Sequence, residues 1–431
     1  MYNSLNLVQK SVNCAINEFC FMEREIYKDL LKWKSKRGHK PLLLQGAPMV
    51  GKTYIAKEFG KHEYTHYVRF SFLEQPVLKN IFRNQPEVTK VIRLLSSLFR
   101  RDIVPGETLL ILDDIHLCAD AVELLRDFSE DAPNLDLIAI ACFSEADAGY
   151  SLIPFDALDH LTLHPMNFDE FLLAQGRTSL APKLLDALKH YAFCGGMPAV
   201  VQAYLENPEL GPMAIRQMQL DLLQSLESRL TPRQAEVWNA VHQRMCKDNH
   251  KFFYSDIKKA ARVKDFKPAV TQLIQKGLLF CTHRVDAVSQ PLDYYKDEDS
   301  FVLYPLDVGL LAAKLAVEPQ EILVSGSALA SHGQALARQI ASQTLRTKSF
   351  PVYHFARTGS LVTMDFIIQT GSRIVAVEVN ARPAGNDKAL KLFSAAHPGR
   401  RSVRLSLEEQ SALSWMENVP LYSFGEFLSS L

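Results

Sequence analysis

The stretch Pro41-Leu-Leu-Leu-Gln-Gly-Ala-Pro-Met-Val-Gly-Lys-Thr53 decides the fold of the first part of the chain. An apolar run, typical of a buried strand, leads into Gly46-x-x-x-x-Gly51-Lys52-Thr53, and a helical pattern follows from Thr53 to Phe59. This order predicts a phosphate-binding loop, because the glycines let successive backbone N–H groups point at one phosphate. The flanking strand and helix favour this interpretation over a plain glycine-rich turn.

The residue types of the loop indicate how it would hold ATP with Mg²⁺. Lys52 is expected to neutralise the outer phosphates and the Thr53 hydroxyl to bind Mg²⁺, while the helix that follows adds its positive end. The residues expected to contact ATP are Gly46, Ala47, Pro48, Met49, Val50, Gly51, Lys52, Thr53 and Tyr54.

A second apolar run, Thr108-Leu-Leu-Ile-Leu-Asp-Asp-Ile-His116, ends in two carboxylates. A buried parallel strand delivers such acids to the nucleotide edge of a sheet, so Asp113 is expected to hold Mg²⁺ and Asp114 to orient the attacking water. The alternative is a buried strand that ends in a solvated turn. A further apolar strand ends at Ser144, which is expected to sense the γ-phosphate, although such a serine is commonly a simple cap.

Strands and helices alternate in this part of the chain, which predicts a parallel sheet covered on both faces. A strand is expected over 66–72, and a long helical zone over 77–101 that ends before Val104-Pro-Gly. Upstream of the loop, Ile26, Leu30 and Trp33 have the spacing of an amphipathic helix. That helix is expected to pack beside the nucleotide site.

The composition of the 431 residues excludes several classes of protein. Forty-eight Lys and Arg balance forty-eight Asp and Glu, so the whole molecule is not an electrostatic binder of nucleic acid. No apolar run reaches the ~20 residues that span a membrane, and the start lacks a signal core, so a cytoplasmic protein with no membrane contact is expected. The seven cysteines form no C-x-x-C pair, which favours buried thiols over disulfides or zinc.

Five motifs in order resemble the AAA+-like ATP-binding proteins of bacteria and archaea that carry a C-terminal domain of unknown function. Besides the phosphate loop and Leu112-Asp-Asp-Ile, they are Pro165-Met-Asn-Phe-Asp-Glu-Phe171, Gly195-Gly-Met-Pro198 and Leu303-Tyr-Pro-Leu-Asp-Val-Gly-Leu-Leu311. The resemblance implies an α/β fold with a P-loop NTPase sheet (1–165), a helical lid (166–228), a winged-helix-like domain (229–314) and a degenerate PD-(D/E)XK nuclease-like domain (315–431).

The chain also departs from the family at positions that matter for hydrolysis. The family usually has Asp-Glu where this chain has Asp113-Asp114, and often Gly-Arg where it has Asp156-Ala157. A well-placed arginine is worth about 10³ to 10⁵ in the rate of phosphoryl transfer. We therefore expect ATP to bind and to be hydrolysed slowly.

The segment from Thr231 to Arg284 is locally basic, with eleven Lys or Arg against four Asp or Glu. Helical patterns over 254–261 and 264–276, followed by an apolar strand, resemble the helix, recognition helix and wing of a winged helix. Lys264, Lys267 and Arg284 are the candidate contacts to DNA phosphates. A solvated basic face, or a surface for a protein partner, is the alternative.

In the last part of the chain, two β-runs flank Gly371-Ser372 and predict a hairpin. If Thr370 pairs with Arg373, counting outward places Asp365 opposite Glu378, where the two like charges repel unless a cation or a proton lies between them.

This layout resembles the PD-(D/E)XK nuclease core, with Asp365 and Glu378 as ligands of a second metal ion. Asn380 stands where those nucleases carry lysine, however, and Ser331 falls near the place of a further acid. Two acids on a solvated strand face are the plain alternative.

Three functions remain open at this stage. The first is an ATP-dependent switch that moves the winged helix and the nuclease-like domain against DNA or a protein partner. The second is an ATP-regulated, metal-dependent nuclease, and the third is an ATP-binding scaffold without hydrolysis. The sequence leaves the oligomeric state open.

Overall fold

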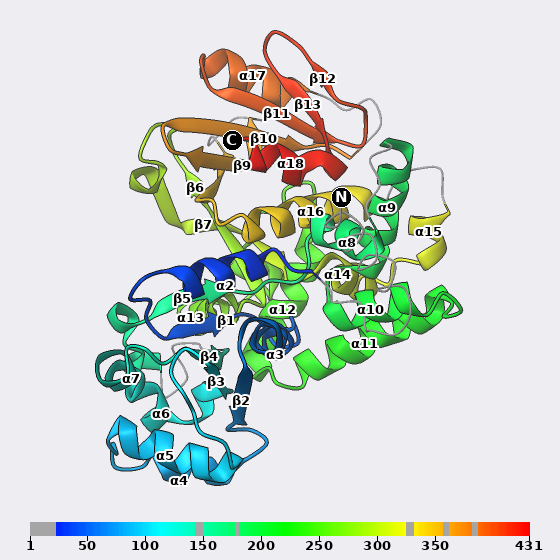
Figure 1. The fold of residues 1–431 in the computed structure, drawn as a ribbon. Coiled ribbons are helices and arrows are strands. Elements are labelled where there is room, and N and C mark those ends of the chain that lie inside the picture. The colour runs from blue at the N-terminus through cyan, green and yellow to red at the C-terminus, as the bar shows by residue number, and fades with distance from the viewer. Residues whose placement is uncertain (1–22, 143–149, 177–180, 325–331, 357–361, 382–386) are drawn as a thin grey trace, which may run out of the picture.

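The computed structural model describes residues 23–142, 150–176, 181–324, 332–356, 362–381 and 387–431. Figure 1 shows one lobe built on a parallel sheet and, at the opposite end, a second lobe built on a larger mixed sheet, with helices between them. None of the helices in the described ranges is both long and apolar enough to cross a membrane.

The first lobe contains a five-stranded sheet in which all pairings are parallel and the strand order is β2-β3-β4-β1-β5. Its strands are β1 (Leu42–Gln45), β2 (His66–Ser71), β3 (Thr108–Asp113), β4 (Leu137–Ala141) and β5 (Asp159–Thr162). Every residue of β3 and β4 is buried, which explains their continuous apolar sequences. The predicted parallel α/β sheet is confirmed.

Two helices frame the phosphate loop. The helix α2 (Ile26–Ser35) buries Ile26, Leu30 and Trp33, as their spacing predicts, and α3 (Lys52–Glu63) begins directly after the loop. Farther along the chain lie α6 (Ala119–Glu123) and α7 (Leu125–Asp131).

The helical zone expected over 77–101 is helical but interrupted. The structure has a 3₁₀ turn (Pro76–Leu78), then α4 (Lys79–Phe82) and α5 (Val88–Phe99). The break contains Pro86, and the two residues before it, Asn84 and Gln85, have positive φ. A residue that precedes proline is disfavoured in the helical region, so the helix stops there.

The helices between the two lobes form one continuous core with the parallel sheet. They are α8 (Phe168–Gln175), α9 (Ala181–Cys194), α10 (Pro198–Glu206), α11 (Pro212–Glu227), α12 (Pro232–Met245), α13 (Val263–Gln275), α14 (Val308–Lys314), α15 (Pro319–Leu323) and α16 (Gly333–Thr347).

The helix expected over 254–261 is reduced to a single 3₁₀ turn, Tyr254–Asp256. The Asp256 carboxylate accepts from the backbone N–H of Phe253 and from Arg244, which anchors the turn at its own start. Such local side-chain bonds to the backbone compete with a continuing helix.

The second sheet has eight strands in the order β12-β13-β11-β10-β9-β8-β6-β7. They are β6 (Leu279–Val285), β7 (Lys296–Pro305), β8 (Val352–Ala356), β9 (Thr363–Thr370), β10 (Arg373–Val379), β11 (Arg401–Ser406), β12 (Ser411–Ala412) and β13 (Glu417–Pro420), and α17 (Lys388–Ala396) and α18 (Phe424–Ser429) flank them. Because β6 pairs with β8, this sheet runs across the domain boundary expected between residues 314 and 315.

Candidate functional site

The phosphate loop has the backbone that its glycines predict. Gly46 and Gly51 have φ of 148° and 94°, and a Cβ on Gly46 would lie 2.2 Å from the carbonyl oxygen of Leu163. Lys52 Nζ donates to the carbonyl oxygens of Gly46 and Ala47, at 2.8 and 2.7 Å. The ammonium group is therefore held at the mouth of the loop, where the outer phosphates of ATP would lie.

Charged groups from several elements surround Lys52. Burial lowers the pKa of Lys52, and the nearby Cys142, Asp113 and Asp114 act in the opposite direction. Arg229, which follows α11, also lowers this pKa, so its positive charge lies within electrostatic range of the ammonium. Sequence reasoning missed this cation, since no local pattern distinguishes it from other exposed arginines.

The two residues predicted to hold Mg²⁺ are in contact. Thr53 Oγ1 donates to Asp113 Oδ2 at 2.9 Å, and the Asp113 side chain is buried at the end of β3. A hydroxyl and a carboxylate side by side fit Mg²⁺, which prefers a few protein oxygens and completes its shell with water and phosphate. Arg69 Nε, on the neighbouring strand β2, donates to the same Asp113 oxygen at 2.8 Å.

Asp114 lies immediately beyond β3 in the left-handed backbone region, with φ 57° and ψ 36°. Its Oδ2 accepts from Ser71 Oγ at 3.1 Å, and its backbone N–H donates to Asp113 Oδ1 at 3.0 Å. Strained backbone of this kind is found at active sites when the surroundings hold it in place. The ends of β2 and β3 thus fix both carboxylates.

A buried ion pair supports the loop from behind. Arg24 Nε donates to Glu170 Oε1 at 3.0 Å, and the other guanidinium nitrogens donate to the carbonyl oxygens of Val50 and His164. Glu170 also belongs to a capping box with Asn167, which starts α8. The Pro165–Phe171 motif is therefore connected to the phosphate loop through Arg24, which Glu170 holds and which donates to the carbonyl oxygen of Val50.

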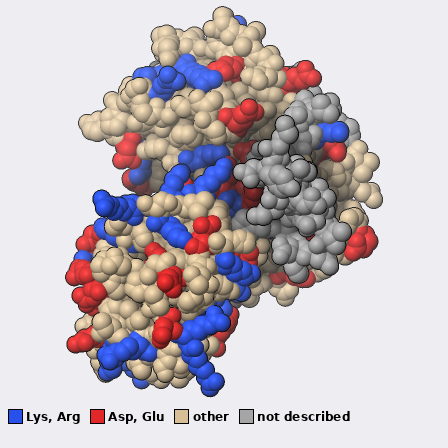
Figure 2. Space-filling view, viewed as in Figure 1, with Lys and Arg blue, Asp and Glu red and all other residues tan. Residues whose placement is uncertain are grey.

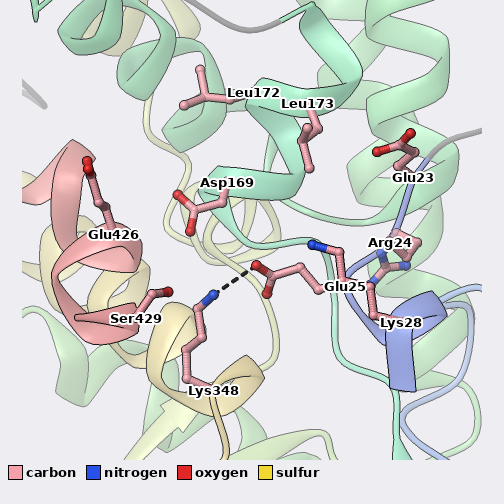
Figure 3. Close-up of a pocket in the computed structure, with 10 residues that line it drawn as sticks. All are labelled: Glu23, Arg24, Glu25, Lys28, Asp169, Leu172, Leu173, Lys348, Glu426 and Ser429. Carbon is pink, nitrogen blue, oxygen red and sulfur yellow. Dashed lines mark hydrogen bonds and ion pairs between the residues drawn. The ribbon is translucent and has the colours of Figure 1, made fainter. Parts of the chain in front are cut away.

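A pocket of about 480 Å³ opens where α2, α8, α18 and the end of α16 meet. Figure 3 shows Lys348 donating to Glu25, and Asp169 and Glu426 line the same pocket. Burial raises the pKa of Asp169 to about 6, although Lys348 opposes the shift. The pocket adjoins the phosphate loop through Arg24, which lines it.

The other two family motifs meet at Asp307, which is completely buried. Its Oδ2 accepts from the backbone N–H of Gly196 at 2.6 Å and from Gln343 Nε2 at 3.0 Å. A Cβ on Gly196 would lie 1.9 Å from the carbonyl oxygen of Met166, and one on Gly195 would lie 2.2 Å from Asp307 Oδ1. Both glycines are therefore required by close packing.

The helix α16 reaches from this cluster to the phosphate loop. Arg346, near its C-terminal end, donates to the carbonyl oxygen of Gly277 at 2.9 Å, and a Cβ on Gly277 would lie 3.2 Å from the backbone nitrogen of Ala47. Thr347 Oγ1 accepts from Asn167 Nδ2 at 2.9 Å.

The same helix fills the space beside the predicted acid pair. The register Thr370↔Arg373 is confirmed, and carrying it outward from Phe366↔Val377 places Asp365 opposite Glu378. Arg338 Nε, on α16, donates to Asp365 Oδ1 at 2.9 Å. The cation beside Asp365 is thus a guanidinium supplied by the chain.

Glu378 is the less favourably placed acid of the pair. Burial, then the charges of Asp365 and Asp387, raise its pKa to about 8, while Arg338 and Arg404 oppose the shift. Among the residues that the structure describes, its buried Oε2 has no hydrogen-bond partner. In the described ranges, no three His, Cys, Asp or Glu side chains are arranged to hold a metal ion. A metal at Asp365 and Glu378 stays a prediction.

The three residues predicted to contact DNA differ in how free they are. Lys264 and Lys267 are exposed on α13, and Lys267 lies 3.9 Å from Asp299. Arg284, on β6, pairs with Asp286 at 2.9 Å and with Asp297 at 2.8 Å. The two lysines suit phosphate contact better than this arginine does.

Tyr54, Ser144 and Ser331 are the other positions that the sequence singles out. Tyr54 is 45% exposed at the start of α3. Ser144 and Ser331 lie outside the described residues, so their predicted roles have no structural counterpart here.

Two family models match parts of the chain. Residues 38–172 match an AAA domain, and residues 185–321 match a domain of unknown function, DUF8612. Neither model reaches half of the chain, and no curated protein matches it. The first match and the parallel sheet establish an AAA-type P-loop domain at the N-terminal end.

Solved structures with similar folds have low identity to the chain. The Aeropyrum pernix ORC1 protein in complex with DNA has 13% identity and a TM-score of 0.30, over 68% of this chain and 91% of that one. The Thermotoga maritima RuvB Holliday junction branch migration motor has 16% identity and a TM-score of 0.30, over 60% and 90%. Vibrio cholerae VC1899 has 9% identity and a TM-score of 0.19, over 90% and 96%. Such values carry no functional argument.

Proposed function

We propose that this protein is an ATP-dependent switch that hydrolyses ATP slowly and couples its nucleotide state to the C-terminal sheet. Lys52 and the loop N–H groups bind the phosphates, Thr53 and Asp113 hold Mg²⁺, and Asp114 orients water. Bound Mg²⁺ would neutralise charge that develops on the phosphates. The AAA-domain match and the contact between Thr53 and Asp113 support this assignment.

The observation that carries the proposal is the set of contacts along α16. At one end of the helix, Arg346 donates to the carbonyl oxygen of Gly277, which packs against Ala47 of the phosphate loop, and Thr347 accepts from Asn167. At the other end, Arg338 holds Asp365. Arg338 and Arg346 are eight positions apart, or about 12 Å along the helix. A shift of the phosphate loop against Gly277 would therefore reach the acid pair through one rigid element.

Hydrogen exchange with and without MgATP tests the coupling. In the wild type, MgATP should change the protection of the phosphate loop and also that of α16 and β9. The Lys52→Ala variant should lose both changes, whereas Lys61→Ala, which removes an exposed lysine from the same helix, should keep them. Changes confined to the phosphate loop would contradict the coupling and leave ATP binding intact.

A DNA partner is the form of the switch that α13 favours, because Lys264 and Lys267 are exposed there. Lys264→Glu should weaken binding of a labelled duplex measured by anisotropy, and its effect should shrink as salt is added. Lys391→Glu, which reverses an exposed charge on α17, is the matched control. Equal affinity of the two variants would favour a protein partner.

Nuclease activity is the less favoured function. Arg338 already neutralises Asp365, and Asn380 offers no cation to a phosphate. The raised pKa of Glu378 would also have to fall before this carboxyl could bind a metal ion at neutral pH. Incubating supercoiled plasmid with the protein and Mn²⁺ should therefore give no nicking.

A further inference from the structure

The helix α5 carries two apolar stripes. One stripe, formed by Val88, Val91 and Leu95, is buried in the core of the first lobe. The other contains Leu94 and Leu98, which are 40% and 59% exposed. A helix that packs against the protein with a single face requires a single apolar stripe. The second stripe of α5 therefore points to a further contact.

The second stripe forms one wall of a groove of about 470 Å³. Phe70 of β2 and Leu78 also line the groove and are buried, whereas Val77 lines it at 70% exposure. The ring of Phe99, a further lining residue, lies 5.7 Å from that of Phe70. An apolar concavity of this kind accepts aliphatic side chains in a way that a flat apolar surface does not.

The chain segment that supplies most of the groove residues is basic. Residues 79–101 contain six Lys or Arg and one acid, Glu87. In the described part of the chain none of these six has a carboxylate partner; they are Lys79, Arg83, Lys90, Arg93, Arg100 and Arg101. Figure 2 shows Lys and Arg side chains interspersed with Asp and Glu on the lower lobe, which carries α4 and α5.

We propose that this groove binds an acidic amphipathic helix of a partner protein. The apolar groove would take leucine-like side chains spaced at i and i+3 or i+4, and the Lys and Arg side chains of residues 79–101 would attract carboxylates on the flanks of the helix. The α5 residues that line the groove run from Leu94 to Phe99, which is about 8 Å of helix and matches roughly one and a half turns of a docked helix.

Two synthetic peptides test this proposal with the full-length protein. Both are sixteen-residue amphipathic helices with leucine at the anchor positions, and they differ in carrying glutamate or lysine at every flanking position. Fluorescence anisotropy at low salt should show that the wild type binds the acidic peptide at least about tenfold more tightly than the basic one. Equal binding of the two peptides would overturn the proposal.

Variants locate the binding site. Leu98→Ser should weaken binding of the acidic peptide about tenfold, which is the typical effect on affinity of losing one buried anchor residue. Leu413→Ser is the matched control, because that leucine is 56% exposed between β12 and β13. Arg93→Glu should reduce the preference for the acidic peptide without changing the melting temperature, since its side chain is exposed.

Two other occupants would overturn the proposal. A dimer of the wild type in sedimentation that Leu98→Ser dissociates would identify a second copy of the chain. Binding to vesicles with anionic headgroups, but not to the acidic peptide, would identify a lipid surface.

Discussion

Replacing Glu378 by glutamine should stabilise the protein, although it removes a charged residue from a predicted site. The folded-state pKa of this carboxyl is raised from 4.5 to about 8. The folded state favours the neutral form of this carboxyl. The stability that the neutral form provides is therefore fully present below pH 4.5 and is lost as the pH rises through 8. At pH 7 the cost is about 2.5 pKa units at 1.36 kcal/mol each, or about 3 kcal/mol.

Glutamine removes this cost because it stays neutral. The wild-type carboxyl lacks the same partner at Oε2, so this deficit cancels and a net gain of about 3 kcal/mol is expected at pH 7. The gain should fall to about 1 kcal/mol at pH 5, where most of the electrostatic cost is absent.

Urea unfolding of both proteins at pH 5, 7 and 8 measures the difference. Asp365→Asn is the contrasting control, because it should destabilise by about 3 kcal/mol through loss of the Arg338 partner. A Glu378→Gln difference that is independent of pH, or that has the opposite sign at pH 7, would refute the electrostatic reasoning.

Three further predictions concern the nucleotide site and its support. Lys52→Ala should weaken MgATP binding by about 2 kcal/mol, or roughly thirtyfold, in calorimetry; unchanged affinity would refute the nucleotide assignment. Asp114→Ala should abolish the slow phosphate release of the wild type while ATP still binds, so measurable turnover by this variant would contradict its role. Gly196→Ala should lower the melting temperature, because the new methyl group would meet the Met166 carbonyl at 1.9 Å, whereas Gly211→Ala meets no atom within 4 Å and should leave it nearly unchanged.

Local patterns predicted the parts of the site that lie within one strand-loop-helix unit or one hairpin. The phosphate loop requires glycines with positive φ directly before a helix, and a few adjacent residues of the sequence are enough to specify this. The pairing of Thr370 with Arg373 follows from the two-residue turn between them. In both cases the geometry depends on near neighbours in the sequence.

The contacts that sequence reasoning missed join residues far apart in the chain. Arg338 is an ordinary helical arginine until β9 is packed against α16. Asp307 lies in one of the family motifs, but the motif does not reveal that the backbone of Gly196, far away in the sequence, donates to it. The continuous sheet across residue 314 was missed for the same reason, because β6 and β8 are separated by β7 and three helices. Pairing of this kind depends on topology more than on local propensity.

The position of β6 in the larger sheet limits how this protein could have been assembled in evolution. Its two neighbours are β7 on one side and β8 on the other, and β8 belongs to the C-terminal segment. A chain shortened at residue 314 would expose a row of unpaired N–H and C=O groups along β6, which is a template for aggregation. Recombination at residue 314 would give proteins with this exposed edge, and selection would act against them. The segment that begins with α12 and the C-terminal sheet should therefore be inherited as a single unit.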